Sequence, residues 1–207
     1  GRTRSIIGAQ SLINAGLPNN VYALRNGIMG WRLSGLKPAA GESNWAPMPN
    51  AAGLSKSMDA AEGVASRFDV TQIEAAELVL WRAERTSRSL FLLDVRTIEE
   101  YEAGHLTDAL HAPGGQVVQA TDEYIGARNA RIVLVDNDGV RALMTASWLI
   151  QMGQKDVRIL KMDSSKESVI QGAASTPVIG LEDQTLHEIS AQTLIEKQLE
   201  GAAVLDL

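Results

Sequence analysis

Two uninterrupted apolar runs constrain the fold of this chain more than any other feature. They are Phe91-Leu92-Leu93 and Ile132-Val133-Leu134-Val135, and segments with helical periodicity lie between and around them. A strand that is apolar on both faces must be covered on both faces, as the strands of parallel sheets are. Strands that alternate with helices are typical of an α/β domain. The pattern therefore predicts an α/β fold with a parallel sheet covered by helices on both faces.

The expected elements form one complete unit at about residues 66–163. Thr71 follows Val70 and is the expected N-cap of the first helix, because its hydroxyl can accept a hydrogen bond from the first turn. We expect strands at 69–70, 90–94, 109–112, 131–135 and 157–160, and helices at 72–84, 99–103 and 141–153, with helical turns up to 128.

The composition excludes several classes of function. Of the 207 residues, 45% are hydrophobic and 21% are charged, which is typical of a globular protein. The net charge of -6 provides no basic face for phosphate backbones, so we expect no nucleic-acid partner. Neither an apolar stretch of membrane-spanning length nor a signal peptide is found in the sequence. We therefore expect a cytoplasmic protein with no membrane partner.

The absence of cysteine limits the chemistry further. With 0 cysteines in the sequence, disulfides, thiolate metal sites and thiol nucleophiles are excluded within this chain. The 3 histidines are His105, His111 and His187, and no carboxylates accompany them at the spacing of metal ligands. We therefore expect no metal and no cofactor.

An internal repeat divides the chain. Arg4–Gly16 aligns with Arg141–Gly153 at a constant offset of 137 (141 minus 4). Both segments have apolar residues at helical spacing, end at a glycine suited to a helix C-terminus, and precede a short apolar run, at 21–24 and at 157–160. We expect both short runs to be strands. Trp148 is expected on the buried face of its helix.

A second similarity links Leu92–Val95 to Val204–Leu207, and Ser190 is the expected N-cap of the helix that precedes the second run. The chain also begins without Met, so we expect a section of a longer repeat protein. The expected division is a truncated end of a preceding repeat at 1–36, a linker at 37–65, a complete repeat at 66–163, a linker at 164–186 and the truncated start of a following repeat at 187–207.

The loop Asp136–Val140 is the expected site. In open α/β sheets, ligands bind beyond the carboxyl ends of strands, where helix N-termini present backbone amides to anions. This loop joins the strand 132–135 to the helix that begins at Arg141, which fits that geometry. A plain strand-to-helix turn with an Asx cap fits it equally well, and the sequence leaves both interpretations open.

Three motifs resemble the rhodanese family. Asp94–Leu106 resembles the rhodanese signature, a strand ending in Asp-x-Arg followed by Glu-Tyr and Gly-His-Ile. Asp136–Arg141 resembles the active-site loop Cys-x-x-Gly-x-Arg, and Asn26–Trp31 resembles the closing segment Gly-Gly-x-x-x-Trp. The matches follow the family's order and span the chain apart from its linkers. The resemblance is closest to bacterial proteins with four rhodanese repeats, and it implies a rhodanese-like five-stranded parallel sheet. Its structural signature residues are Asp94, Glu100, Tyr101, Gly104 and His105.

The resemblance implies a sulfurtransferase, in which a loop cysteine takes sulfane sulfur from a thiosulfate-type donor and passes it as a persulfide to a nucleophile. Asp136 occupies the position of that cysteine. A carboxylate cannot form a persulfide, and Asp136 and Asp138 place two negative charges where an anionic donor would bind. The complete repeat is therefore expected to be inactive. Its degenerate loop is Asp136, Asn137, Asp138, Gly139, Val140 and Arg141.

The first five residues, Gly1-Arg2-Thr3-Arg4-Ser5, look like the second half of a different, cationic active loop whose cysteine would lie upstream. The alternative is that Arg2 and Arg4 are solvated terminal charges. Arg4, Arg96 and Arg141 are the candidate substrate-binding residues. For Arg96, an ion pair with Asp94 that joins the strand to the loop is the favoured interpretation.

Two functions remain open. The parent protein is either a sulfurtransferase in which this repeat serves as scaffold or active-site wall, or a non-catalytic binding or scaffolding array. The expected partners are neighbouring rhodanese repeats and a small sulfur donor and acceptor. Phosphatases that share this fold use a cysteine in a longer loop, so phosphoryl chemistry is disfavoured.

Overall fold

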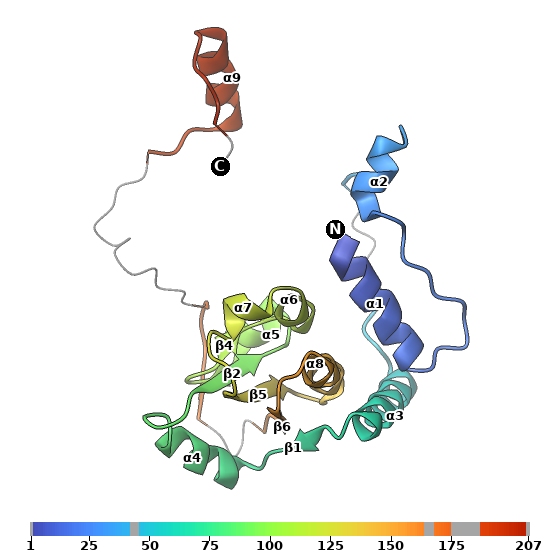
Figure 1. Cartoon of the computed structure of the whole chain (residues 1–207), viewed down its shortest axis with the longest axis vertical. Helices are drawn as coiled ribbons and strands as arrows, with labels where there is room; N and C mark the ends of the chain where they lie inside the picture. Colours follow the sequence, from blue (N-terminus) through green and yellow to red (C-terminus); the bar gives the residue numbers. More distant parts are fainter. Residues whose placement is uncertain (1, 42–45, 164–167, 175–186, 206–207) are drawn as a thin grey trace. The chain divides into compact units, whose positions relative to one another are not determined.

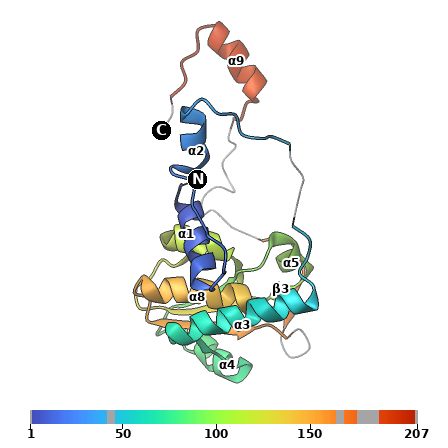
Figure 2. The same cartoon turned by 90° about the vertical axis from the view of Figure 1, so that its right-hand side faces the viewer.

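The computed structural model describes residues 2–41, 46–163, 168–174 and 187–205. The chain divides into two units, Gly1–Ala174 and Ser175–Leu207 (Figures 1 and 2). The helices are α1 (Arg2–Asn14), α2 (Gly27–Leu33), α3 (Ala51–Arg67), α4 (Ala75–Ala83), α5 (Ile98–Ala103), α6 (Gly114–Gln119), α7 (Thr121–Tyr124), α8 (Val140–Gln151) and α9 (Ala191–Leu199). The strands are β1 (Thr71–Gln72), β2 (Leu90–Asp94), β3 (His105–Leu106), β4 (Leu110–His111), β5 (Arg131–Asp136), β6 (Asp156–Lys161) and β7 (Val169–Ile170).

The predicted sheet is confirmed. Five strands lie in the order β1-β6-β5-β2-β4, and every neighbouring pair is parallel. The two apolar runs fall on the neighbouring central strands β2 and β5, where Leu93 pairs with Leu134. The loop that follows β5 therefore lies at the centre of the carboxyl edge of the sheet.

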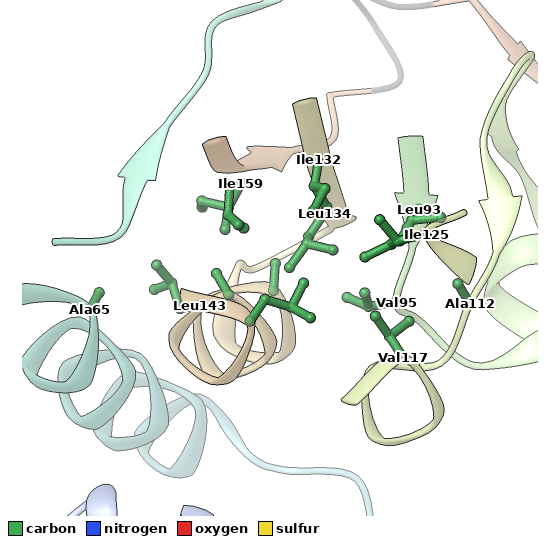
Figure 3. Packing of buried hydrophobic residues seen from close by; sticks show 14 of the residues in the cluster. Ala65, Leu93, Val95, Ala112, Val117, Ile125, Ile132, Leu134, Leu143 and Ile159 are labelled. Atoms are coloured by element: carbon green, nitrogen blue, oxygen red, sulfur yellow. The ribbon is translucent and has the colours of Figure 1, made fainter. Parts of the chain in front are cut away.

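The central strands are apolar on both faces because each face packs against helices. In β5, Ile132 and Leu134 belong to one buried cluster, whereas Val133 and Val135 belong to another. Figure 3 shows side chains of β2, β5 and β6 pointing towards α8, with α3 and α6 on either side of it. On the opposite face, Trp81 of α4 packs in the second cluster. The predicted cover on both faces is confirmed.

The predicted N-cap at Thr71 is wrong. Thr71 and Gln72 form strand β1, whose residues pair with Arg158 and Ile159 of β6. The helix begins later, at Ala75, and Glu74 is its N-cap residue. Pairing with a buried strand satisfies the backbone here, and this tertiary contact outweighs the local capping preference of threonine.

Much of the first predicted linker is helical, so the linker at 37–65 needs correction. Residues 51–67 form α3, which Asn50 caps through its side chain. Ala61, Val64 and Ala65 are buried, and α3 packs against α8. Small residues suggested a linker, but alanine has the highest helix propensity and allows close helix packing. In the second linker, 169–170 form β7, antiparallel to β3, whereas 164–167 and 175–186 lie outside the described residues.

The strand that the sequence predicted at 21–24 is not formed. Residues 21–24 belong to no helix or strand, and the side chain of Tyr22 is 83% exposed. No strand among the described residues pairs with them, and a strand without a neighbour has no ladder of hydrogen bonds. At the other end, Val204 and Leu205 are also irregular, whereas 206–207 lie outside the described residues. The predicted cap at Ser190 is confirmed, because its hydroxyl accepts from the amide of Thr193.

None of the helices in the described part of the chain is both long enough and apolar enough to span a bilayer.

Candidate functional site

The loop between β5 and α8 forms the candidate site. Asp136 is the last residue of β5 and is fully buried. Gly139 precedes α8 with a φ of 87°, a conformation that L residues rarely adopt. A Cβ atom at this glycine would also lie 2.7 Å from the side chain of Lys161. The glycine therefore lets the chain turn sharply from the sheet into the helix.

The backbone amides of this loop converge on the carboxylate of Asp136. The amide of Asn137 donates to Oδ1 at 2.9 Å, and the amides of Arg141 and Ala142 donate to Oδ2 at 2.9 and 3.2 Å. These amides belong to the loop and to the first turn of α8, where backbone donors lack partners within the helix. The loop therefore forms an anion cradle, and a carboxylate of the chain itself occupies it.

Arg141 adds its charge to the cradle. Its Nε and Nη2 atoms donate to Oδ1 of Asp136 at 3.1 and 2.8 Å. Its Nη1 and Nη2 atoms also donate to Glu100, at 2.5 and 3.1 Å. One guanidinium group thus bridges two carboxylates, and the three side chains together carry one negative charge.

Asp138 accepts a hydrogen bond from within the loop. Its Oδ1 atom accepts from the amide of Val140 at 2.9 Å, which is an Asx turn. Of the two interpretations left open by the sequence, the Asx turn is therefore present, whereas the amides that would bind a ligand are bonded to a carboxylate of the chain itself.

Glu100 links the cradle to α5. Its carboxylate accepts from the amide of Thr97, and the Thr97 hydroxyl accepts from the amide of Glu100, which is a capping box. The hydrogen bond from Arg141 is the main cause of the pKa of Glu100 lying at about 2, below its usual 4.5. The sequence indicated Glu100 as a structural residue, but its partner Arg141 lies 41 residues away and was not predicted.

Replacing Glu100 by glutamine is expected to destabilise the chain by about 1 kcal/mol at neutral pH, because the ion pair is partly exposed. The lowered pKa means that the stabilisation by Glu100 is fully present above about pH 4.5 and is lost as the pH falls towards about 2. Urea unfolding of both proteins at several pH values measures this. The difference between them narrows on acidification, and a difference that is constant with pH contradicts the assignment.

The buried side chain of Arg96 forms hydrogen bonds with three segments of the chain. Its guanidinium donates to both carboxylate oxygens of Asp94, at 2.9 and 2.7 Å, and to the carbonyl of Gly104 at 2.7 Å. It also donates to Oδ1 of Asn137 in the loop, at 3.0 Å. The side chain is only 3% exposed. This placement supports the structural interpretation of Asp94 and Arg96 over a substrate-binding one.

The other signature residues stabilise α5 and the turn after it. Tyr101 donates through its hydroxyl to the carbonyl of Ala109 at 2.8 Å. The ring of His105 stacks on that of Tyr101 with 3.6 Å between centroids, and its Nδ1 lies 2.8 Å from the Tyr101 carbonyl. The placement fits the structural role that the resemblance implied for His105. No cluster of three potential metal ligands occurs among the described residues.

Residues 1–5 are the predicted second half of a different, cationic active loop. Of these, residues 2–5 lie at the start of α1. Thr3 and Arg4 are exposed, whereas Gly1 and the side chain of Arg2 lie outside the described part. A substrate-binding role of Arg4 stays a prediction. Farther along α1, Ser11 accepts a hydrogen bond from Trp148 Nε1 at 2.9 Å. Trp148 is half-buried and lies on the side of α8 away from the sheet core, so its predicted place on the buried face is wrong.

A pocket of about 250 Å³ lies in front of the loop. Glu100, Asp138 and Arg141 form part of its wall, and Met48 and Leu54, from the segment before α3 and its first turn, form another part. Two of its three charged side chains are carboxylates, so the pocket favours cations over an anionic sulfur donor.

Comparisons with known proteins agree with this architecture. The rhodanese-like domain family matches residues 75–166. A solved structure of a thiosulfate sulfurtransferase from Pseudomonas aeruginosa is 45% identical and aligns with a TM-score of 0.80, covering 96% of this chain and 37% of that one. YrkF of Bacillus subtilis, which is assigned as a sulfur carrier protein, is 36% identical over 72 residues, or 35% of this chain and 38% of YrkF.

This chain therefore spans well under half the length of either relative. The Asp94–Arg96 pair, the loop after β5 and the strands β2, β4, β5 and β6 of the parallel sheet all lie within the matched residues. Residues 75–166 thus match the rhodanese-like domain family, and the chain is similar to part of a solved thiosulfate sulfurtransferase.

Proposed function

We propose that the domain at 75–166 is a non-catalytic member of the sulfurtransferase family. One observation carries the proposal: the carboxylate of Asp136 occupies the cradle in which a persulfide would lie, and it takes the hydrogen bonds of the loop amides and of Arg141. A carboxylate oxygen has no sulfur to exchange. Its hydrogen bonds also engage the amides of Asn137, Arg141 and Ala142, so these donors do not face an incoming thiosulfate.

We further propose that the sulfur chemistry of the parent protein takes place in another repeat. The likeness to the longer Pseudomonas aeruginosa protein supports a parent that extends beyond this chain. In this proposal 1–36 and 187–207 are parts of flanking repeats, the neighbouring repeats are the partners, and the small sulfur donor and acceptor bind elsewhere in the cytoplasmic parent.

A scaffolding role fits the same domain. The hydrogen bond between Ser11 and Trp148 and the packing of α1 against α6 connect the N-terminal segment to the domain. A rigid, internally satisfied loop suits a domain that holds a neighbour in place, because it does not need to open for a substrate.

A thiosulfate–cyanide assay tests the proposal. In the active reaction, a thiolate attacks the sulfane sulfur, sulfite leaves, and cyanide removes the sulfur as thiocyanate. The chain is expected to form thiocyanate only at the uncatalysed rate, whereas the Pseudomonas aeruginosa relative, assayed in parallel, serves as the positive control. Turnover that disappears in the Asp136→Ala variant would overturn the proposal.

A further inference from the structure

We infer that the outward face of α1 is a docking surface for the parallel sheet of a second rhodanese-like unit. In this arrangement α1 packs against the sheet of that unit as α8 packs against the sheet of the domain described above. The inference rests on the proposed repeat origin of residues 1–36 and adds which face binds, what binds there, and how the two units meet.

The two helices end in the same way. Gly16 and Gly153 are equivalent at the repeat offset, and both have positive φ values, of 77° and 94°. Each is followed by the same reverse bond across the last turn, from the residue after the glycine to the residue four before it. These bonds are Leu17 N to Leu12 O at 3.3 Å and Gln154 N to Leu149 O at 3.0 Å. The repeat is therefore present in the backbone as well as in the sequence.

The core-facing side chains of α8 have close counterparts on α1. Leu143 and Leu149 of α8 are buried against the sheet, with 7% and 0% exposure. Their equivalents, Ile6 and Leu12, are also large and aliphatic, but they are 52% and 45% exposed. The alanine between them is retained, at 146 and at 9. The side chains that would fill a core are present on α1, and no sheet in the described residues covers them.

The opposite sides of the two helices already meet. Ile7 and Ser11 of α1 line a pocket of about 250 Å³ together with Met144 and Trp148, which are their own equivalents on α8. Ser11 and Trp148, joined by a hydrogen bond, are also 137 residues apart, the repeat offset. Equivalent residues of both helices thus line this pocket, and one hydrogen bond joins the helices there.

The correspondence between α1 and α8 indicates what would cover the outward face of α1. With about 100° between successive helix residues, Ile6 and Ala9 lie on the side of α1 opposite to Ile7 and Ser11. On α8 the corresponding side packs against β2, β5 and β6. Residues 21–24, which follow α1 as β6 follows α8, belong to no helix or strand and are largely exposed. A parallel sheet with a vacant position next to its central strand would cover both the helix face and this segment.

A fusion protein tests the inference. A second copy of residues 66–137 is placed ahead of Gly1 of the full chain, which keeps the repeat offset and supplies the missing strands. The amides of α1 and of 21–24 are expected to exchange with deuterium at least about a hundredfold more slowly in the fusion than in the chain alone. Exchange at the same rate in both proteins would overturn the inference.

Two neighbouring substitutions provide the matched control. Ile6→Asp in the fusion is expected to remove the added protection, because it places a charge in the new core. Ile7→Asp lies on the opposite side and is expected to leave the protection of 21–24 in place. A chain that forms dimers by light scattering, and becomes monomeric with Ile6→Asp, would instead assign the face to a second copy. None of these measurements depends on sulfur transfer. A failure of the proposed function is detected by the thiosulfate–cyanide assay, and a failure of this inference by the exchange rates.

Discussion

Replacing Asp136 by alanine is expected to destabilise the chain by about 3–5 kcal/mol, because three backbone amides and Arg141 lose the acceptor that they share. Asp136 is fully buried and accepts from three backbone amides and from Arg141. Without the carboxylate these amides lose their acceptor, and buried donors without partners cost about 1–3 kcal/mol each. Since small domains have about 5–15 kcal/mol of stability, this loss would be a large share.

Urea denaturation followed by circular dichroism measures this effect. Asp138→Ala is the matched control, because Asp138 is half-buried and accepts a single backbone bond, from Val140. It is expected to cost about 1 kcal/mol, the usual loss of one cap. Asp136→Asn retains an oxygen acceptor and is expected to fall between the two. If Asp136→Ala and Asp138→Ala have equal effects, Asp136 is not the centre of the loop's hydrogen bonding.

The sheet could be predicted from the sequence because its signal is local. The runs at 91–93 and 132–135 are apolar on consecutive residues, and such short runs are typical of strands that are buried on both faces. The loop after β5 followed from the same runs, since a parallel sheet places it at the carboxyl edge. Helix α3 could not be recognised, because Ala61 and Ala65 are buried only through their contact with α8.

The electrostatics of the loop were only partly predictable. The sequence indicated that Asp136 and Asp138 add negative charge at the loop, which suggested repulsion of an anion. The structure adds that Asp136 is itself the bound anion, held by amides whose direction depends on the turn at Gly139. The contribution of Glu100 depends on a contact between α5 and α8, and no spacing in the sequence reveals such a contact.

The terminal segments also show that contacts with distant parts of the chain cannot be predicted from the local sequence. Residues 21–24 have the composition of a strand, yet they do not form one, because a strand exists only beside another strand. Helix α1 does form although no sheet among the described residues covers its outward face, since its hydrogen bonds lie within the helix. The repeat in the sequence therefore indicates which segments are equivalent, but the structure of each segment also depends on the strands that lie beside it.

Replacing Asp136 by cysteine is expected to convert the loop into a persulfide-forming site. The thiolate would lie where the carboxylate lies now, within reach of the amides of Arg141 and Ala142 and of the Arg141 guanidinium. Donors and positive charge of this kind lower a thiol pKa below its usual value of about 8.5. The thiolate would attack the sulfane sulfur of thiosulfate, the sulfur–sulfur bond would break, and sulfite would leave. Mass spectrometry detects the gain of one sulfur atom.

The remaining negative charge limits this reaction. Asp138 lies at the mouth of the loop, and Glu100 still neutralises Arg141, so thiosulfate is repelled even when the cysteine is present. Asp138→Asn removes one of these charges and keeps the oxygen that accepts from Val140. The double variant is therefore expected to gain sulfur several-fold faster than Asp136→Cys alone, and with a weaker dependence on salt.

Asp136→Ser is the control for the nucleophile, because it has nearly the same shape and no thiol, and it is expected to gain no sulfur. The rate of alkylation by iodoacetamide across pH reports the thiol pKa independently of thiosulfate. A cysteine with an ordinary thiol pKa and no gain of sulfur in the double variant would mean that the cradle no longer stabilises an anionic sulfur. A lowered thiol pKa without sulfur transfer would place the deficit in donor binding instead, so the two measurements separate loss of the nucleophile from loss of the site around it.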